Sequence, residues 1–426
     1  MNAPFLKTNK MKHIMQKKNP ETVTTKIAAI LLLMLFQAIQ LLSQEKVTYT
    51  GLIVDAKTKE PIELVSIYAL SGNTITNTNG EYEIKSNEDE TISFSHVSYN
   101  TQQISVRNLP AVIELLPKIF NLEEVIVVPK ENVIKELKAV WNKYNTLLKG
   151  KKEKDFPQKT FYYRQLTFDL DTCVEYIESF FTAPTSIALK TMSLQEGRYA
   201  RANKSTAPRY LNFYTFSRIA SFSGDKVKKN TFNPLLTADF EKYYDVHIRQ
   251  IISPNQSDEV RVYEFVPIGN KLTRNLIVFS GSLFIRSRDQ AIIRMEANTV
   301  LPFRSKDVTF LGQNFNTTIT YNEADDNAYP IVESVFSKLY LKFYNNQTNE
   351  TYSVTVQSTL ILENFTFNSK GNQLNTRDVL LQQLENSAYN QDFWDNNPIV
   401  KRTKIEQQVI DDFNREGYFG TMNLDN

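Results

Sequence analysis

Short stretches in which apolar and polar residues alternate predominate between residues 47 and 367, and they predict a mainly β chain. Successive side chains of a strand point to opposite faces, so alternation produces one apolar face and one polar face. Two stretches, at 131–146 and after residue 403, instead repeat apolar residues at helical spacing. The pattern therefore predicts an α+β fold that is mainly β.

The first alternating segment, residues 45–128, consists of short strands separated by turn residues. About seven such strands in a segment of this size predict a small antiparallel β-sandwich. Asn79-Gly80 between alternating residues favours a hairpin, because both positions of the usual two-residue turn have positive φ. The strands are expected at 47–54, 64–70, 76–84, 91–95, 103–106 and 111–116.

Residues 131–146 carry one apolar stripe at helical spacing. Asn132 can cap the start of this helix through its side-chain oxygen, and Gly150 stands just beyond its end. Such a stripe can bind a partner, but it is more often part of the protein's own core, and we interpret it as core. The stripe consists of Val133, Ile134, Leu137, Val140, Trp141 and Tyr144.

The remaining alternating strands predict one curved antiparallel sheet within a third segment, residues 129–426. An amphipathic helix must bury its stripe, so we expect helix 131–146 or a C-terminal helix to cover the concave face. An incomplete cover would leave a cavity lined by Phe, Tyr, Ile and Leu. The strands are expected at 161–168, 174–180, 243–252, 259–266, 275–285, 291–298, 316–322, 332–344 and 351–365.

Two hairpins predict how side chains divide between the faces of this sheet. The first turns at 169–172 and the second at 287–290. In the first hairpin one face should hold Tyr162, Arg164, Leu166 and Phe168 together with Val174, Tyr176, Glu178 and Phe180. In the second hairpin one face should hold Leu283, Ile285, Ile293 and Met295.

The C-terminal region predicts two helices. Thr403 and Glu406 have the spacing of a capping box, in which hydroxyl and carboxylate each accept from the other's backbone N–H. Gly417 fits the far end of this helix. Its apolar stripe is Ile405, Val409, Ile410 and Phe413, and a second helix is expected at 376–388 with Val379, Leu380, Leu384 and Ala388.

The N-terminus predicts export. Residues 27–42 form an apolar run of sixteen residues, interrupted by Gln37 and Gln40, and six lysines precede it. A spanning helix needs about 20 apolar residues, so this run is short for an anchor and typical of a signal peptide. We expect residues 1–44 to be a leader cleaved between Leu42 and Glu45; an uncleaved anchor is the alternative. The mature chain should have no transmembrane segment and should lie in the periplasm or at the outer membrane.

Removing the leader changes the charge. The formal net charge of +2 includes six lysines and one glutamate of residues 1–44, so the mature chain carries about −3. A nucleic-acid-binding domain would present a basic face, and this composition argues against such a partner. The single cysteine, Cys173, can form no intramolecular disulfide, and its strand-like surroundings predict a buried, inert thiol.

A series of landmarks in residues 46–128 resembles the carboxypeptidase regulatory-like domain. The resemblance implies a transthyretin-like β-sandwich that acts as a scaffold without peptidase activity. The segment that follows, Leu122 to Val128, is similar to the stretch behind this domain in envelope proteins, including TonB-dependent receptors. Ser98 stands where the family commonly has a glycine. The landmarks are Gly51, Asp55, Pro61, Ile62, Val65, Ile67, Thr78, Asn79, Gly80, Tyr82, Ile84, Ile92, Phe94, Ser95 and Tyr99.

Familiar catalytic motifs are missing from the sequence. A zinc peptidase needs histidine and glutamate ligands, but the three histidines are His13, His96 and His247, and none begins an H-x-x-E element. No G-x-S-x-G elbow and no phosphate-binding glycine loop occurs. We interpret His96 as structural and expect no catalytic, cofactor-binding or metal-binding residue and no cofactor. If an unfamiliar hydrolase site exists, Glu175, Glu178 and Arg198 are its most suggestive members.

A second resemblance concerns the large sheet. The segments 281–285 and 291–294, with a later Tyr329-Pro330-Ile331-Val332, resemble strands of the open half-barrel in lipoprotein-sorting proteins, which implies a sheet around an apolar cavity. Three functions remain open. The chain is a non-catalytic envelope protein that binds a ligand or protein partner, a periplasmic carrier or sensor of lipid or lipoprotein, or a hydrolase with an unrecognised site.

Overall fold

The computed structural model describes eleven stretches of the chain, and the account below concerns these residues. The predicted leader and the predicted helix at 376–388 lie outside them. The described elements all lie in one compact unit, Thr48–Asn426, except for the first residue of β1. The described residues are 46–118, 128–185, 192–202, 237–269, 278–300, 307–323, 330–364, 367, 372–374, 390–396 and 400–419.

The prediction of a mainly β chain is confirmed. The N-terminal segment forms two sheets, with strand orders β4-β1-β7 and β3-β2-β5-β6. The prediction of purely antiparallel pairing was wrong, because β1 and β7 pair in parallel. Alternation of apolar residues is the same in parallel and antiparallel pairs, so the sequence could not distinguish them. The strands are β1 Val47–Asp55, β2 Ser66–Ala69, β3 Gly72–Ile75, β4 Glu81–Ser86, β5 Thr91–His96, β6 Tyr99–Ser105 and β7 Val112–Leu115, with a 3-10 turn at Val106–Asn108.

Both small sheets contribute to one apolar core, which includes Ile53 and Tyr82 from the first sheet and Ile67 and Phe94 from the second. The turn at Asn77–Gly80 connects β3 in one sheet to β4 in the other, so the predicted hairpin within one sheet was wrong. The side-chain oxygen of Asn77 accepts from the N–H groups of Asn79 and Glu81 at 2.9 and 3.0 Å. Gly80 has φ +73°, whereas Asn79 does not have positive φ.

Gly80→Val is expected to lower the free energy of unfolding by about 1–3 kcal/mol, the usual cost of a strained backbone position. Positive φ is unfavourable for a β-branched residue, and a Cβ at this position would lie 2.6 Å from the carbonyl oxygen of Ile53. Chemical denaturation of the full chain measures the loss. Gly312→Val is the control, because a Cβ there meets no atom within 4 Å. Equal stability of the two variants would contradict this account of the turn.

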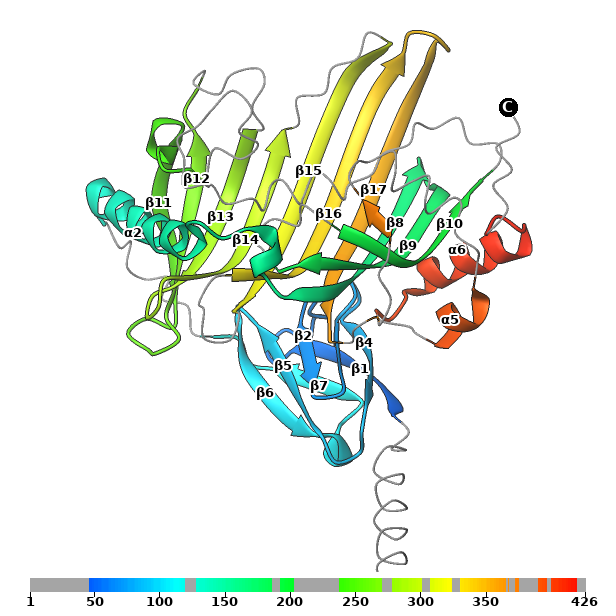
Figure 1. Ribbon diagram of the computed structural model, residues 1–426, viewed down its shortest axis with the longest axis horizontal. Helices are drawn as coiled ribbons and strands as arrows, with labels where there is room; N and C mark the ends of the chain where they lie inside the picture. The colour runs from blue at the N-terminus through cyan, green and yellow to red at the C-terminus, as the bar shows by residue number, and fades with distance from the viewer. Residues whose placement is uncertain are drawn as a thin grey trace, which may run out of the picture. The chain divides into compact units, whose positions relative to one another are not determined.

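The rest of the described chain forms one antiparallel sheet of eleven strands in the order β11-β12-β13-β14-β15-β16-β17-β8-β9-β10-β18. Figure 1 shows it running from β11 beside α2 to β10 beside α6. The strands are β8 Gln158–Asp169, β9 Thr172–Pro184, β10 Met192–Arg201, β11 Tyr244–Ile252, β12 Val260–Pro267, β13 Val278–Arg286, β14 Ala291–Val300, β15 Val308–Glu323, β16 Pro330–Asn345, β17 Glu350–Glu363 and β18 Asn372–Leu374.

Helix α2, Lys130–Leu148, packs on one face of this sheet, called here the inner face. Its stripe is buried as predicted, with Ile134 only partly covered. The hydroxyl of Tyr144 accepts from the N–H of Ile292 at 2.9 Å and donates to the carbonyl of Gln290 at 3.2 Å. The predicted cap was wrong, because Pro129 occupies the N-cap position and Asn132 lies inside the helix. Gly150 follows the helix with φ +76°.

Helices α5, Gln391–Asn396, and α6, Lys404–Arg415, pack on the opposite, outer face, against Phe180 of β9 and Leu166 of β8. The predicted capping box of α6 is confirmed, and Gly417 follows it with φ +69°. Ile410 and Phe413 are buried, but Ile405 is 68% exposed, so its place in the apolar stripe was wrong. Helices therefore pack on both faces of the sheet, whereas the sequence predicted a helix on the concave face alone.

Two bulges change the predicted faces of the sheet. Tyr162, Arg164 and Leu166 share a face with Phe180, Glu178 and Tyr176, as predicted, and the strand register pairs them in that order. A register shift between Thr167 and Phe168 moves Val174 to the inner face. A second shift, between Phe284 and Ile285, puts Ile293 on the outer face, whereas Leu283, Ile285 and Met295 lie on the inner face. An extra residue in one strand reverses the alternation after it, which the local pattern does not reveal.

Candidate functional site

A cleft opens on the outer face of the sheet, and two cross-strand rows of side chains from β15, β16, β17 and β8 form its floor. Strand register places each residue beside its neighbour in the row, with alternate residues directed to the same face. The first row is Thr318, Phe336, Thr359 and Arg164, and the second is Asn316, Lys338, Gln357 and Leu166.

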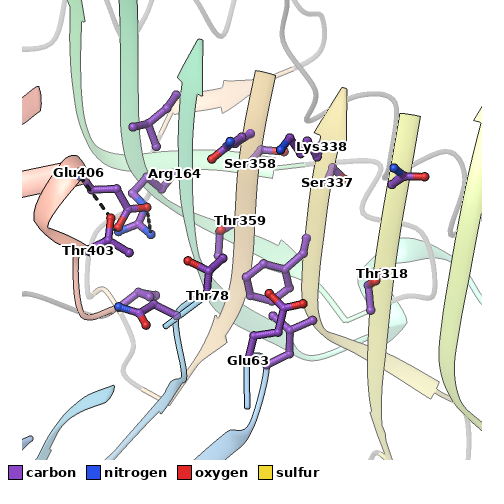
Figure 2. Close-up of a pocket in the computed structure, with 17 residues that line it drawn as sticks. Glu63, Thr78, Arg164, Thr318, Ser337, Lys338, Ser358, Thr359, Thr403 and Glu406 are labelled. Carbon is purple, nitrogen blue, oxygen red and sulfur yellow. Dashed lines mark hydrogen bonds and ion pairs between the residues drawn. The ribbon is translucent and has the colours of Figure 1, made fainter. Parts of the chain in front are cut away.

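The walls of the cleft come from two other parts of the chain. Glu63, Leu64, Asn77 and Thr78 belong to the N-terminal segment, and Val400, Thr403 and Glu406 belong to the start of α6 and the residues before it. The cavity measures about 310 Å³. Figure 2 shows Arg164, Thr403 and Glu406 together at one end and Thr318 at the other, with Thr78 and Thr359 between them.

A neutralised ion pair closes one end of the cleft. Nη2 of Arg164 lies 2.8 Å from Oε1 of Glu406, while Oε2 of Glu406 accepts from the N–H of Thr403 at 2.7 Å. Burial alone would lower the pKa of Arg164, but the Glu406 carboxylate raises it above its usual value. Nη1 of Arg164 is buried and has no hydrogen-bond partner among the described residues. The capping box thus positions the carboxylate that holds Arg164 in place.

Most polar side chains of the cleft floor do not interact with other described side chains or backbone groups. The side chains of Asn316, Thr318, Lys338, Gln357 and Thr359 form no hydrogen bond or ion pair with any described residue. Thr359 is only 9% exposed, so its hydroxyl is held at the base of the cleft with little access to bulk water. Thr318 is half-buried, and Asn316, Lys338 and Gln357 are exposed in the open cleft, so their polar groups are available to a ligand. The two rows are therefore a candidate binding site.

The structure divides the three residues that the sequence marked for an unfamiliar hydrolase. Glu178 and Arg198 meet on the outer face, with Nε of Arg198 2.7 Å from Oε2 of Glu178. Trp394 of α5 covers the guanidinium at 4.8 Å, and both charged residues are at most 3% exposed. Although burial raises the pKa of Glu178, Arg198 and Arg402 hold it at about 2. This pair is enclosed and anchors the C-terminal segment.

Glu175 lies on the other face. It accepts from the hydroxyls of Tyr199 and Thr167 at 2.7 and 3.1 Å and from Arg201 at 3.1 Å. Glu175 and Glu178 are three positions apart in one strand, so their side chains point in opposite directions. The structure therefore does not bring the three suggestive residues together.

His96 and Cys173 have the surroundings of structural residues. Nδ1 of His96 accepts from the N–H of Ser98 at 3.2 Å, and Nε2 lies 3.2 Å from Arg294. Burial, with Arg294 and Lys118 nearby, lowers the pKa of His96 to about 3. Cys173 is half-buried, so the prediction of a fully buried thiol was wrong, but partial burial still raises the pKa of the thiol to about 12. Within the described ranges, no three acidic, histidine or cysteine side chains are grouped to hold a metal ion.

The cleft was not predicted from the sequence. It differs from the apolar cavity expected beneath a helix, because it lies on the face opposite α2 and most of its lining residues carry a hydroxyl or an amide group. The available signals were the Thr403–Glu406 capping box and the alternation that placed Arg164 and Leu166 on one face. Neither signal reveals that β17 pairs with β8 and brings Thr359 beside Arg164.

A comparison with family models agrees with the resemblance of residues 46–128. The model of the CarboxypepD_reg-like domain matches residues 49–127. Among solved structures, the chain is similar to a LolA superfamily protein from Nitrosomonas europaea, with 12% identity, a TM-score of 0.19, and coverage of 56% of this chain and 96% of that one. It is also similar to a DUF1329 family protein from Desulfovibrio piger, with 9% identity, a TM-score of 0.20, and coverage of 57% and 99%. A search of curated proteins gives no match.

The described helices are all too short or too polar to cross a membrane.

Proposed function

We propose that this chain is an exported, non-catalytic protein of the cell envelope that binds a small polar ligand in the outer-face cleft. The observation that carries the proposal is the floor of the cleft, where five polar side chains have no described protein partner. The carboxypeptidase regulatory-like segment, residues 45–128, supplies one wall as a scaffold, and the third segment, residues 129–426, supplies the floor and the second wall.

The arrangement of charges favours binding over catalysis. A hydroxyl nucleophile needs an adjacent base, and the described histidines, His96 and His247, do not line the cleft. The carboxylate of Glu406 is occupied by Arg164 and by the backbone of Thr403. Glu63, the other carboxylate of the lining, forms no hydrogen bond with a described hydroxyl. The serine and threonine hydroxyls of the cleft are therefore positioned to form hydrogen bonds without an adjacent base.

Native mass spectrometry of protein purified from the envelope fraction tests this proposal. The wild type should retain a small molecule that is lost from the double variant Lys338→Glu, Thr359→Val. Lys342→Glu is the matched control, because Lys342 lies on the same face of β16 as Lys338 but outside the cleft. This variant should retain the ligand. Retention by the double variant would place binding elsewhere, and the absence of a ligand from all three proteins would contradict the proposal. N-terminal sequencing of the same sample tests export, and an intact Met1 would contradict leader cleavage.

The purified protein is expected to contain no stoichiometric zinc and to release no C-terminal amino acids from peptides. The expectation rests on the sequence, in which no histidine begins an H-x-x-E element. Elemental analysis and a peptide-release assay with and without chelator measure both properties. One zinc ion per chain together with chelator-sensitive cleavage would establish a metallopeptidase instead.

A second candidate function is carriage of lipid or lipoprotein on the inner face. Strands β16 and β17 carry a row of apolar side chains there, which includes Val335, Leu339, Val354 and Val356. These side chains are at most 1% exposed, so an acyl chain would reach them only if the packing against them opened. The same mass spectra distinguish the two functions, because a bound lipid would survive the cleft substitutions and a cleft ligand would not.

A further inference from the structure

We infer that the outer-face cleft takes a neutral, polyhydroxylated ligand, a saccharide of one or two rings. This inference rests on the proposed function and names the ligand class of the same site. It follows from four properties of the described lining residues: their balance of charge, their hydrogen-bonding groups, one aromatic ring in the floor, and the size of the cavity.

The charges of the lining cancel. Glu63 and Glu406 carry negative charge, and Arg164 and Lys338 carry positive charge. Arg164 and Glu406 also neutralise each other directly at 2.8 Å. A charged ligand would gain little from a site whose net charge is zero, because any attraction to one group is offset by repulsion from another. The balance favours a neutral ligand.

The polar groups of the cleft match a ligand with many hydroxyls. Threonine hydroxyls and the amides of Asn316 and Gln357 each donate and accept hydrogen bonds. A sugar hydroxyl also does both, so neighbouring groups on one ring can be satisfied along the two rows. A fatty acyl chain would leave these groups unpaired, and each unpaired group costs about 1–3 kcal/mol. The floor therefore disfavours an apolar ligand.

Phe336 adds a platform to this polar floor. Its row places it between Thr318 and Thr359, and its ring is partly buried against the apolar cluster that includes Ile361 and Trp394. An aromatic face is electron-rich and attracts the polarised C–H groups that a sugar ring presents on its flat side. Hydroxyl and amide groups on either side of one ring face are the arrangement that a pyranose requires.

The size of the cavity limits the ligand. About 310 Å³ is at the lower end of the range for small-molecule sites, which suits one or two sugar rings and excludes a longer buried chain.

Isothermal titration of the full-length protein with a panel of neutral mono- and disaccharides tests this inference. The panel contains glucose, galactose, mannose, N-acetylglucosamine, maltose, cellobiose and xylobiose. At least one is expected to bind, with an affinity that does not change between low and high salt, because salt screens charges and leaves neutral hydrogen bonding unaffected. Phe336→Ala and Gln357→Leu should each weaken binding at least tenfold.

Tyr340→Ala is the matched control for the aromatic substitution, because Tyr340 lies on the same face of β16, is 39% exposed and does not line the cleft. This variant should bind as the wild type does. Gln357 is exposed, so Gln357→Leu remains informative if Phe336→Ala fails to fold.

Three outcomes would overturn the saccharide assignment: no binding anywhere in the panel, affinity that falls steeply with salt, or equal affinity in Gln357→Leu and the wild type. Inorganic phosphate and octanoate serve as anionic and apolar probes in parallel titrations. If either binds in a manner that Gln357→Leu abolishes, the cleft remains a ligand site and only the ligand class is wrong. If no probe binds and native mass spectra show no cleft-dependent ligand, the proposed function fails as well.

Discussion

Arg198→Met is expected to lower the free energy of unfolding by about 3–5 kcal/mol, the usual cost of leaving one buried charge without its partner. Glu178 is 3% exposed and accepts from Nε of Arg198 at 2.7 Å, from its Nη2, and from the hydroxyl of Tyr176 at 2.8 Å. Without the guanidinium, the carboxylate remains buried beneath α5, where water cannot replace the lost interaction. Arg402, at 3.7 Å, compensates only in part.

An exposed ion pair provides the control for this prediction. Lys59 and Glu114 lie 2.6 Å apart, but their side chains are 58% and 50% exposed. Lys59→Met should therefore change the stability by less than about 1 kcal/mol. Urea denaturation of the full chain measures both variants. The double variant Arg198→Met, Glu178→Leu should recover part of the loss, since it removes the unpaired charge. Equal effects of Arg198→Met and Lys59→Met would show that the buried pair contributes no more to the free energy of unfolding than the exposed pair does.

Patterns confined to one element were predicted well. The alternation within β8 and within β9 placed Arg164 and Glu178 on one face, and the Thr403–Glu406 spacing identified the start of α6. Both features depend on neighbours within a few residues, where backbone geometry determines which side chains meet. The stripe of α2 was likewise predicted as core and is buried against the sheet.

Features that depend on distant parts of the chain were missed. A single bulge moved Val174 to the other face, and the parallel pairing of β1 with β7 leaves no trace in the alternation. The cleft combines three such features, because its floor depends on which strands pair and its walls depend on where two separate segments pack. Its individual members, such as Gln357 and Asn316, are ordinary polar residues of exposed strand faces in the sequence. Only the register of the four strands β15, β16, β17 and β8 distinguishes these cleft residues from other polar residues on exposed strand faces.

A pH-dependent loss of stability is expected from two carboxyl groups buried where the N-terminal segment meets the large sheet. Glu333 is 8% exposed and its described hydrogen-bond partner is Ser66 of β2. Burial raises the pKa of Glu333 to about 7 from its ordinary value of 4.5. Glu363 is 5% exposed, its Oε1 has no hydrogen-bond partner, and burial raises its pKa well above the ordinary value.

The direction of the effect follows from proton binding. Between pH 4.5 and about 7, the folded chain keeps the proton on Glu333 and the unfolded chain releases it. The folded state is therefore favoured at the acidic end of this range, and the free energy of unfolding falls as the pH rises through it. A pKa difference of this size corresponds to about 3 kcal/mol. Glu363, whose pKa burial also raises, changes stability in the same direction.

Glu333→Gln should remove the pH dependence contributed by this residue, because an amide does not ionise. We expect the variant to be more stable than the wild type at pH 8 by about 3 kcal/mol and close to it at pH 5. Urea denaturation across this range measures the difference. Glu88→Gln, at an exposed position, should show the same difference from the wild type at both pH values. If Glu333→Gln were no more stable than the wild type at pH 8, the Glu333 carboxylate of the wild type would have to be solvated or paired in the folded chain. The N-terminal segment would then not bury this group against the sheet.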